Sequence, residues 1–145
     1  MDERLKKVLV SLQGRCARRE YCRAEMRQKA LKALDGDAAA AEEILESLVV
    51  DGFVDDARYA GAFAREKAVL DGWGPVKIRY MLRGKGIEAS DIDEALASID
   101  AGAASEKLDK LLAAKAKSLQ GDPQARLKLI KYALSRGYNY EDIKV

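Results

Sequence analysis

The chain has 145 residues and nearly balanced charge, with 26 Lys and Arg, 24 Asp and Glu, and no histidine. Apolar residues make up 48% of it, and only two prolines and 11 glycines interrupt it. This composition favours an all-α protein. No apolar run approaches the roughly 18 residues of a membrane span. The N-terminal stretch MDERLKKVLV has no apolar core typical of a signal peptide. We therefore expect a cytoplasmic protein with no membrane contact.

The same counts argue against an enzyme. Without histidine the chain has no residue of the type that most often acts as a general base. Cys16 and Cys22 have no histidine or second cysteine pair beside them, so the spacing does not predict a zinc site. No phosphate-binding glycine loop or catalytic triad pattern is present. We expect no catalytic residues, no metal and no cofactor.

Apolar spacing and stop signals predict nine helices. Pro75 and Pro123 each suit the first position of a helix, and Ser90 suits an N-cap. Met81, Leu127 and Leu134 are predicted to face inward. The helices are expected at about 5–14, 18–34, 38–50, 55–70, 75–84, 90–99, 108–121 and 123–136, with a ninth starting at Tyr138 and cut off after about one turn.

The predicted helices fall into groups of three that resemble one another. Pro75 and Pro123 open the middle helices of the second and third groups, and Gly86 and Gly137 close them 51 residues apart. A repeat of this kind predicts tandem helical modules that pack on their neighbours. We therefore expect an elongated, curved, all-α chain of three three-helix modules, the last one truncated. The expected modules span residues 1–54, 55–100 and 101–145.

The small net charge hides a strong segregation. Residues 1–34 carry a net charge of +6, residues 35–56 carry −8, residues 57–100 are neutral, and residues 101–145 carry +4. Within each module the middle helix is basic and the third helix is acidic.

Two interpretations of this segregation stay open. The basic middle helices could simply be neutralised by acidic third helices, since charged faces are ordinary on helices. Alternatively, they could form a basic stripe that binds nucleic-acid phosphates or an acidic protein groove. The stripe offers mostly Lys and Arg, so it does not indicate base-sequence readout. Its candidate binding residues are Arg19, Arg23, Arg27, Lys77, Arg79, Arg83, Lys85, Arg126, Lys128, Lys131 and Arg136.

The segment 51–63, DGFVDDARYAGAF, predicts a junction between the first two modules. Gly52 ends one helix, and Asp55 with Asp56 begins the next. Two adjacent acids could suggest a metal or acid–base site, but N-capping and the helix dipole account for both. Tyr59 and Phe63 lie on the inward face. For Trp73, a lid over the core is favoured over an exposed anchor for a partner or a stacked base.

Several motifs along the chain resemble those of a known family. The run Leu48–Leu96 resembles the core of the RecX family of recombination regulators. The resemblance covers nearly the whole chain, although Ala30 stands where the family pattern has leucine. Its marks are the Gly-x-x-Asp-Asp-x-Arg-aromatic-Ala motif (Gly52, Asp55, Asp56, Arg58, Tyr59, Ala60), the glycine before an Ile-x-x-x-Leu helix (Gly74, Ile78, Leu82), the Lys-Gly-Ile closure (Lys85, Gly86, Ile87) and a final Arg-Gly-aromatic (Arg136, Gly137, Tyr138).

The resemblance implies a non-enzymatic, monomeric modulator of the RecA recombinase that acts in recombination, DNA repair and the SOS response. Such proteins bind along the groove of the RecA–DNA filament and inhibit its recombinase, ATPase and co-protease activities. Weak, non-specific contact with single- or double-stranded DNA is also implied. An alternative from another class is a stand-alone DNA-binding helical module without a recombinase partner. A purely structural scaffold is a third option.

Overall fold

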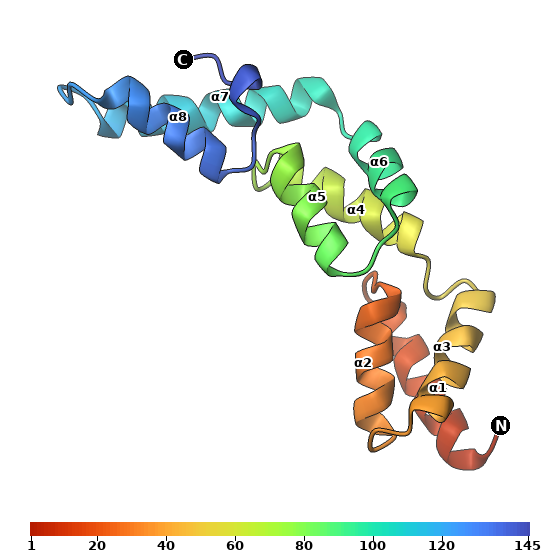
Figure 1. Ribbon diagram of the computed structural model, residues 1–145. Helices are drawn as coiled ribbons and strands as arrows, with labels where there is room; N and C mark the ends of the chain where they lie inside the picture. The colour runs from red at the N-terminus through yellow and green to blue at the C-terminus, as the bar shows by residue number, and fades with distance from the viewer.

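The computed structural model describes residues 1–145 and contains eight α-helices and no strand. The helices follow one another as an elongated arch, with the N-terminus at one end, the turn between the last two helices at the other, and the C-terminus beside those two helices (Figure 1). The predicted all-α, elongated and curved architecture is confirmed. The helices are α1 (Glu3–Cys16), α2 (Arg23–Ala33), α3 (Ala38–Val50), α4 (Asp56–Val69), α5 (Pro75–Gly84), α6 (Ala89–Ala97), α7 (Ala101–Ser118) and α8 (Ala125–Ser135), followed by the 3₁₀ turn Tyr140–Asp142.

Two hydrophobic cores hold the arch together. The first joins α1, α2 and α3 through side chains such as Leu12, Met26 and Ile44, which are at most 4% exposed. The second joins α4, α5 and α6, where Ile78 and Ile92 pack against α4. We call α1–α3 the first module and α4–α6 the second, and we keep 1–54, 55–100 and 101–145 as proposed boundaries.

Helices α7 and α8 form a thinner third module. No residue of α7 is buried, and only Ile130 and Ala133 of α8 are buried. The third module has no core cluster of its own, so its position depends on contacts with the second module. One contact lies at Gly72 (φ +69°), where an added Cβ would stand 2.2 Å from the Leu111 side chain.

Two further glycines bring the backbones of the second and third modules together. The Gly74 N–H donates to the Arg136 carbonyl at 2.7 Å, and the Val76 N–H donates to the Gly137 carbonyl at 2.9 Å. A Cβ on Gly74 would lie 2.3 Å from the Gly137 oxygen, and one on Gly137 would lie 2.3 Å from the Lys77 Cβ. Only glycine permits this approach. The carbonyls of the third module thereby cap the N-terminus of α5, which has no side-chain cap.

The predicted start of the second helix is wrong. Residues 17–22 form a turn and an extended connection, and α2 begins at Arg23. Cys22 is extended at the N-cap (φ −86°, ψ 167°), and its N–H donates to Glu25 Oε1 at 3.0 Å. Cys22 is buried in the second core although it precedes a helix of the first module. The burial of Cys22 in the second core therefore favours extended backbone at this position over a helix that starts at Arg18.

Four other helix-end predictions are also wrong. Helix α7 begins at Ala101 with Asp100 as N-cap, seven residues before the predicted start at about residue 108. Helix α6 begins at Ala89 with Glu88 as N-cap, so Ser90 lies inside the first turn. Helix α8 begins at Ala125, because Asp122 accepts from the Gln124 N–H at 2.8 Å and closes a turn before the helix. The segment after Tyr138 forms a 3₁₀ turn where a ninth α-helix was predicted.

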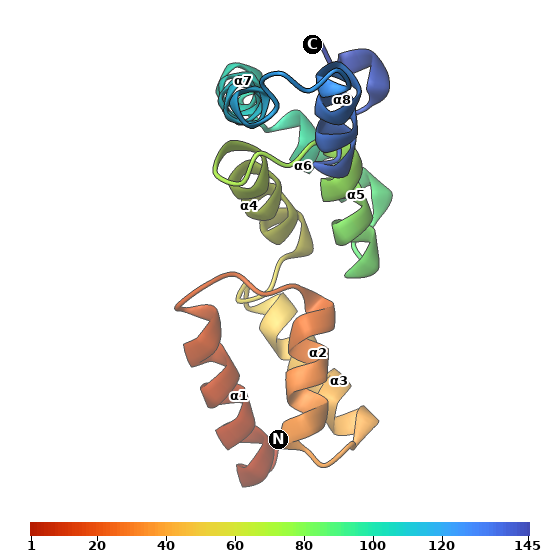
Figure 2. The same ribbon diagram turned by 90° about the vertical axis from the view of Figure 1, so that its left-hand side faces the viewer.

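The middle helices line the same side of the arch. Figure 1 shows α2, α5 and α8 along the concave edge, and Figure 2, which faces that edge, shows them one above another. We call this surface the inner face. The three helices that carry most of the predicted basic stripe therefore lie along the concavity.

Three side chains predicted to face inward are exposed. Met81 is 37% exposed, Leu127 48% and Leu134 44%. On α5 the core is filled by Ile78 and Leu82, which leaves Met81 at its edge. On α8 the face that carries Leu127 and Leu134 has no third helix over it, since the chain forms only a 3₁₀ turn after Tyr138.

The glycine contact between the second and third modules gives a first prediction. Substituting Gly137→Ala places a Cβ against Lys77 at a residue with φ +97°. The strained backbone and the overpacking should together cost about 2–4 kcal/mol of docking free energy. Amide hydrogen exchange should become faster in α7 and α8 and stay unchanged in α1–α3. Gly84→Ala, where a Cβ meets nothing within 4 Å, is the matched control. Equal exchange in both variants would show that the glycine contact does not hold the third module.

Candidate functional site

The junction between the first two modules is built around two aspartates. Asp55 is the N-cap of α4 and accepts from the Arg58 N–H at 3.1 Å, as the sequence predicted. Asp56 reaches back to the first module and accepts from the Arg23 N–H at 2.8 Å. Arg23 is the first residue of α2, so Asp56 supplies the acceptor and the negative charge that a helix N-terminus favours. Burial raises the pKa of Asp56, and the Arg23 N–H and charge partly oppose that effect.

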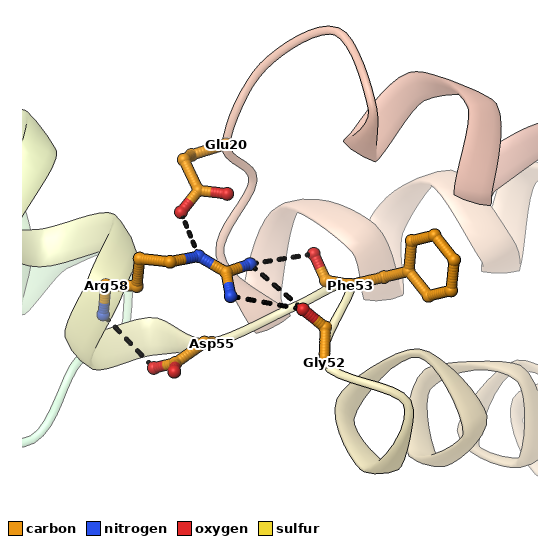
Figure 3. A network of polar contacts seen from close by, with 5 residues as sticks. All are labelled: Glu20, Gly52, Phe53, Asp55 and Arg58. Carbon is orange, nitrogen blue, oxygen red and sulfur yellow. Dashed lines mark hydrogen bonds and ion pairs between the residues drawn. The ribbon is translucent and has the colours of Figure 1, made fainter.

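Arg58 ties three parts of the same junction together (Figure 3). Its Nε donates to Glu20, in the connection between α1 and α2. Its Nη1 and Nη2 both donate to the Gly52 carbonyl at 3.1 Å, and Nη2 also donates to the Phe53 carbonyl at 3.3 Å. The guanidinium thus satisfies carbonyls in the turn after α3 and pairs with an acid of the first module. Its rigid fork of donors suits this task, and lysine could not reproduce it.

A half-buried ion pair also joins the first module to the second. Lys85 Nζ lies 3.3 Å from Glu25 Oε2, and the two side chains are 27% and 24% exposed. Burial alone raises the pKa of Glu25, but the Cys22 N–H and the Lys85 ammonium outweigh it and lower that pKa. Lys85 also sits 5.8 Å from the Tyr59 ring centroid. Lys85, a predicted partner-binding residue, therefore already has an intramolecular partner.

An aromatic row follows from the junction along α4. The rings of Tyr59 and Phe63 stack with centroids 5.9 Å apart, and Trp73 meets Phe63 edge-on at 6.0 Å. Trp73 is half-buried against the second core, in agreement with the predicted lid. Lys77 Nζ lies 4.2 Å from its ring centroid and Lys67 Nζ lies 5.0 Å from it. The predicted binding residue Lys77 thus packs over the tryptophan.

Several other predicted binding residues also form contacts within the chain. In the first two modules the pairing is between middle and third helices: Arg27 with Glu42 at 2.5 Å, and Arg79 with Asp93 at 2.9 Å. Neutralisation by acidic third helices therefore occurs at these two positions. In the third module Lys128 pairs with Asp122, Arg136 donates to the Asp71 carbonyl, and in the first module Arg19 lies over the Tyr21 ring.

The remaining predicted cations have exposed side chains and no ion pair. They carry the positive charge that is free to meet a partner, and they are spread over all three middle helices. They are Arg23, Arg83, Arg126 and Lys131.

Sequence reasoning missed a set of exposed apolar side chains beside these cations. Tyr80 is 75% exposed and Val76 50% exposed on α5. Because Ile78 and Leu82 face the core, Tyr80 points to the opposite side of α5. A shallow depression of about 590 Å³ is lined by Tyr80, Met81, Arg83, Gly84 and Lys85. Tyr80 does not share the helical spacing of the core residues Ile78 and Leu82. That spacing is the sequence signal that could have identified Tyr80 as exposed.

No group of three or more Cys, Asp and Glu side chains is placed to hold a metal ion. None of the helices is both long and apolar enough to cross a bilayer.

The successive helical modules and the contacts that join them place the chain in the class of all-α tandem-repeat proteins. Residues 55–96 match the model of the second three-helix domain of RecX. The chain is 30% identical over 128 residues to the regulatory protein RecX of Pseudomonas entomophila (strain L48), covering 88% of this chain and 81% of the relative. It therefore belongs to the RecX family, and the resemblance predicted from residues 48–96 is confirmed.

Other relatives are longer. The regulatory protein RecX of Clostridium tetani (strain Massachusetts / E88) is 31% identical over 107 residues, which is 71% of this chain and 49% of the relative. The chain thus spans about half the length of that relative. A crystal structure of regulatory protein RecX has a TM-score of 0.84 at 26% identity and covers 96% of this chain and 69% of that one. The fold found here is therefore the fold of that structure.

The Asp56 contact gives a second prediction. Asp56→Ala removes the acceptor for the Arg23 N–H and should lower the free energy of unfolding by about 1 kcal/mol. Asp56→Asn keeps an acceptor oxygen and removes a half-buried charge, so it should be close to the wild type. Chemical denaturation at neutral pH measures both. Equal midpoints for Asp56→Ala and the wild type would show that the cap between modules contributes nothing.

The Glu25–Lys85 pair gives a prediction about pH. The pKa of Glu25 is lowered in the folded chain, so its contribution is fully present above the ordinary carboxylate pKa and is lost as the pH falls through the lowered one. Between neutral pH and about pH 3, the wild type should lose more unfolding free energy than Glu25→Gln. Glu43→Gln, at an exposed acid without an ion pair, should keep the wild-type pH dependence. Parallel curves for Glu25→Gln and the wild type would contradict the role of the pair.

Proposed function

We propose that this chain is a non-catalytic, cytoplasmic, monomeric regulator that binds the RecA–DNA filament and inhibits its recombinase, ATPase and co-protease activities. Membership of the RecX family supports a regulatory role. We infer the RecA partner, the inhibitory effect and the contact residues in addition to that role.

One observation supports the inner face as the binding surface. It combines unpaired cations with large exposed apolar side chains, most clearly at Arg83 and Tyr80 on α5. Tyrosine and arginine are enriched among the residues that contribute most to binding at protein interfaces. A solvated helix whose charges were only neutralised would not need Tyr80 exposed beside Arg83.

The pairing pattern narrows the proposed contact residues. Lys85 and Arg136 form contacts between modules, so replacing either would also disturb the arch. Arg79 is paired with Asp93 at 2.9 Å and is free to exchange that partner, since its side chain is 40% exposed. Arg83, Arg126 and Lys131 are exposed without ion pairs and are the residues from which binding energy is expected.

The concave shape suits a long, curved target. Three modules present α2, α5 and α8 in succession along one side (Figure 2). Several weak contacts on a single chain add up to stronger binding than any one of them, because the later contacts form within the complex. A filament, which repeats its subunits, is a target of this kind.

The test is inhibition of the DNA-dependent ATPase of RecA. Arg83→Glu should weaken inhibition at least about tenfold while helicity stays unchanged, because reversing a charge at a complementary interface introduces repulsion. Reversing Arg79 together with Arg83 should abolish inhibition. Lys117→Glu is the matched control, at an exposed α7 residue without an ion pair. Undiminished inhibition by the double variant would refute these contact residues.

A pull-down at moderate salt distinguishes this function from the alternative, a DNA-binding module without a recombinase partner. Recovery of RecA with the wild type and its loss with Arg79→Glu/Arg83→Glu supports the first function. Recovery of nucleic acid alone supports the alternative.

A further inference from the structure

A cationic groove lies between α1 and α2, apart from the junction and from α5. It has a volume of about 550 Å³, and Figure 2 shows its two helices side by side. Val8 and Leu12 form part of its floor. Its polar lining consists of Lys7, Ser11 and Arg15 from α1 and Lys29 and Lys32 from α2.

No acid lines this groove, and none of its four cations takes part in an ion pair. This differs from the rest of α2, where Arg27 pairs with Glu42. A second depression, lined in part by Arg15 and Arg18, continues the positive row beyond the groove. The groove therefore concentrates positive charge that the chain itself does not neutralise. A concave surface lined by one sign of charge attracts ligands of the opposite sign.

The spacing of the polar side chains suits a polyanion that extends along the helix. Lys7, Ser11 and Arg15 follow at steps of four residues, about 6 Å each and about 12 Å in total. One strand of duplex DNA presents a phosphate about every 3.4 Å along its axis, so this row spans roughly three or four phosphates. The Ser11 hydroxyl can donate to a phosphate oxygen between the two cations.

The floor argues against an acidic protein as the occupant. Leu12 is buried and Val8 is half-buried, and neither belongs to the large exposed hydrophobic residues of the chain. The groove thus has no exposed aromatic or apolar anchor of the kind found on α5, which a protein partner would use. The aliphatic stems of the lysines can lie over the covered floor while their ammonium groups stay at the rim.

We propose that the α1–α2 groove binds the phosphodiester backbone of nucleic acid without reading base sequence. Four cations and a hydroxyl supply the contact. This inference does not depend on the recombinase partner proposed above, and it moves the nucleic-acid contact away from Arg27, which is paired, to residues of α1 that were outside the predicted stripe.

The test measures binding of a labelled oligonucleotide to the full chain, by fluorescence anisotropy, between about 50 and 200 mM salt. Lys29→Gln/Lys32→Gln removes one wall of the groove. The salt dependence should become shallower by about 1.8 for duplex DNA and about 1.4 for a single strand, which corresponds to roughly 60-fold and 25-fold weaker binding at 0.1 M salt. Comparing the two affinities shows whether the groove prefers duplex or single-stranded DNA.

The matched control is Lys117→Gln/Lys144→Gln, which removes the same charge from exposed residues without ion pairs outside the groove. The control should bind with nearly the wild-type affinity and slope. Lys7→Gln/Arg15→Gln removes the opposite wall and should reproduce the effect of Lys29→Gln/Lys32→Gln, with circular dichroism confirming that both variants fold.

Equal losses in the groove variants and the control would overturn the proposal, because net charge alone would then explain binding. Binding to poly-glutamate but not to either oligonucleotide would also overturn it. RecA is absent from the assay, so failure here is distinct from failure of the proposed regulatory function.

Discussion

The arch depends on how the N-termini of its middle helices are satisfied. A helix begins with several backbone N–H groups that have no partner within the helix. In α2 the first of these groups is taken by Asp56, and in α5 the Val76 N–H is taken by the Gly137 carbonyl. Both acceptors belong to the following module. Each middle helix of the first two modules is thus completed by its neighbour, and the modules cannot separate without leaving these donors to water.

This constraint fixes the orientation of the inner face. Because Asp56 and Gly137 contact helix ends, they hold α2 and α5 at a defined position relative to the next module. The Arg58 network and the Glu25–Lys85 pair add directional contacts at the first junction, and Cys22, buried in the second core, adds an apolar one. The second junction relies on close backbone contact at glycines, since the third module has little core of its own. The inner face is therefore presented as one curved surface.

Much of this could be predicted from sequence because it is local. Helix periodicity, the Asp55 cap and the glycine stop at residue 52 are all encoded within a few neighbouring residues, and α3 begins and ends where the pattern predicted. The family motif also marked the junction residues. The contacts between modules could not be derived in this way. Nothing near Arg23 in the chain indicates that Asp56 caps it, and nothing near Gly74 indicates Gly137, because these partners meet only in the folded arch. The same reason explains the errors. The start of α2 is set by burial of Cys22 in another module. Leu127 and Leu134 are exposed because no third helix packs over that face of α8.

The central claim is that the inner face of the arch contacts the RecA–DNA filament. Hydrogen–deuterium exchange of the full chain, alone and with filament assembled on single-stranded DNA, tests it most directly. The account predicts added protection in α5 and α8, and in α2 on the same side, with little change in α3, α6 and α7. Protection confined to those three helices, with α5 and α8 unchanged, would contradict it.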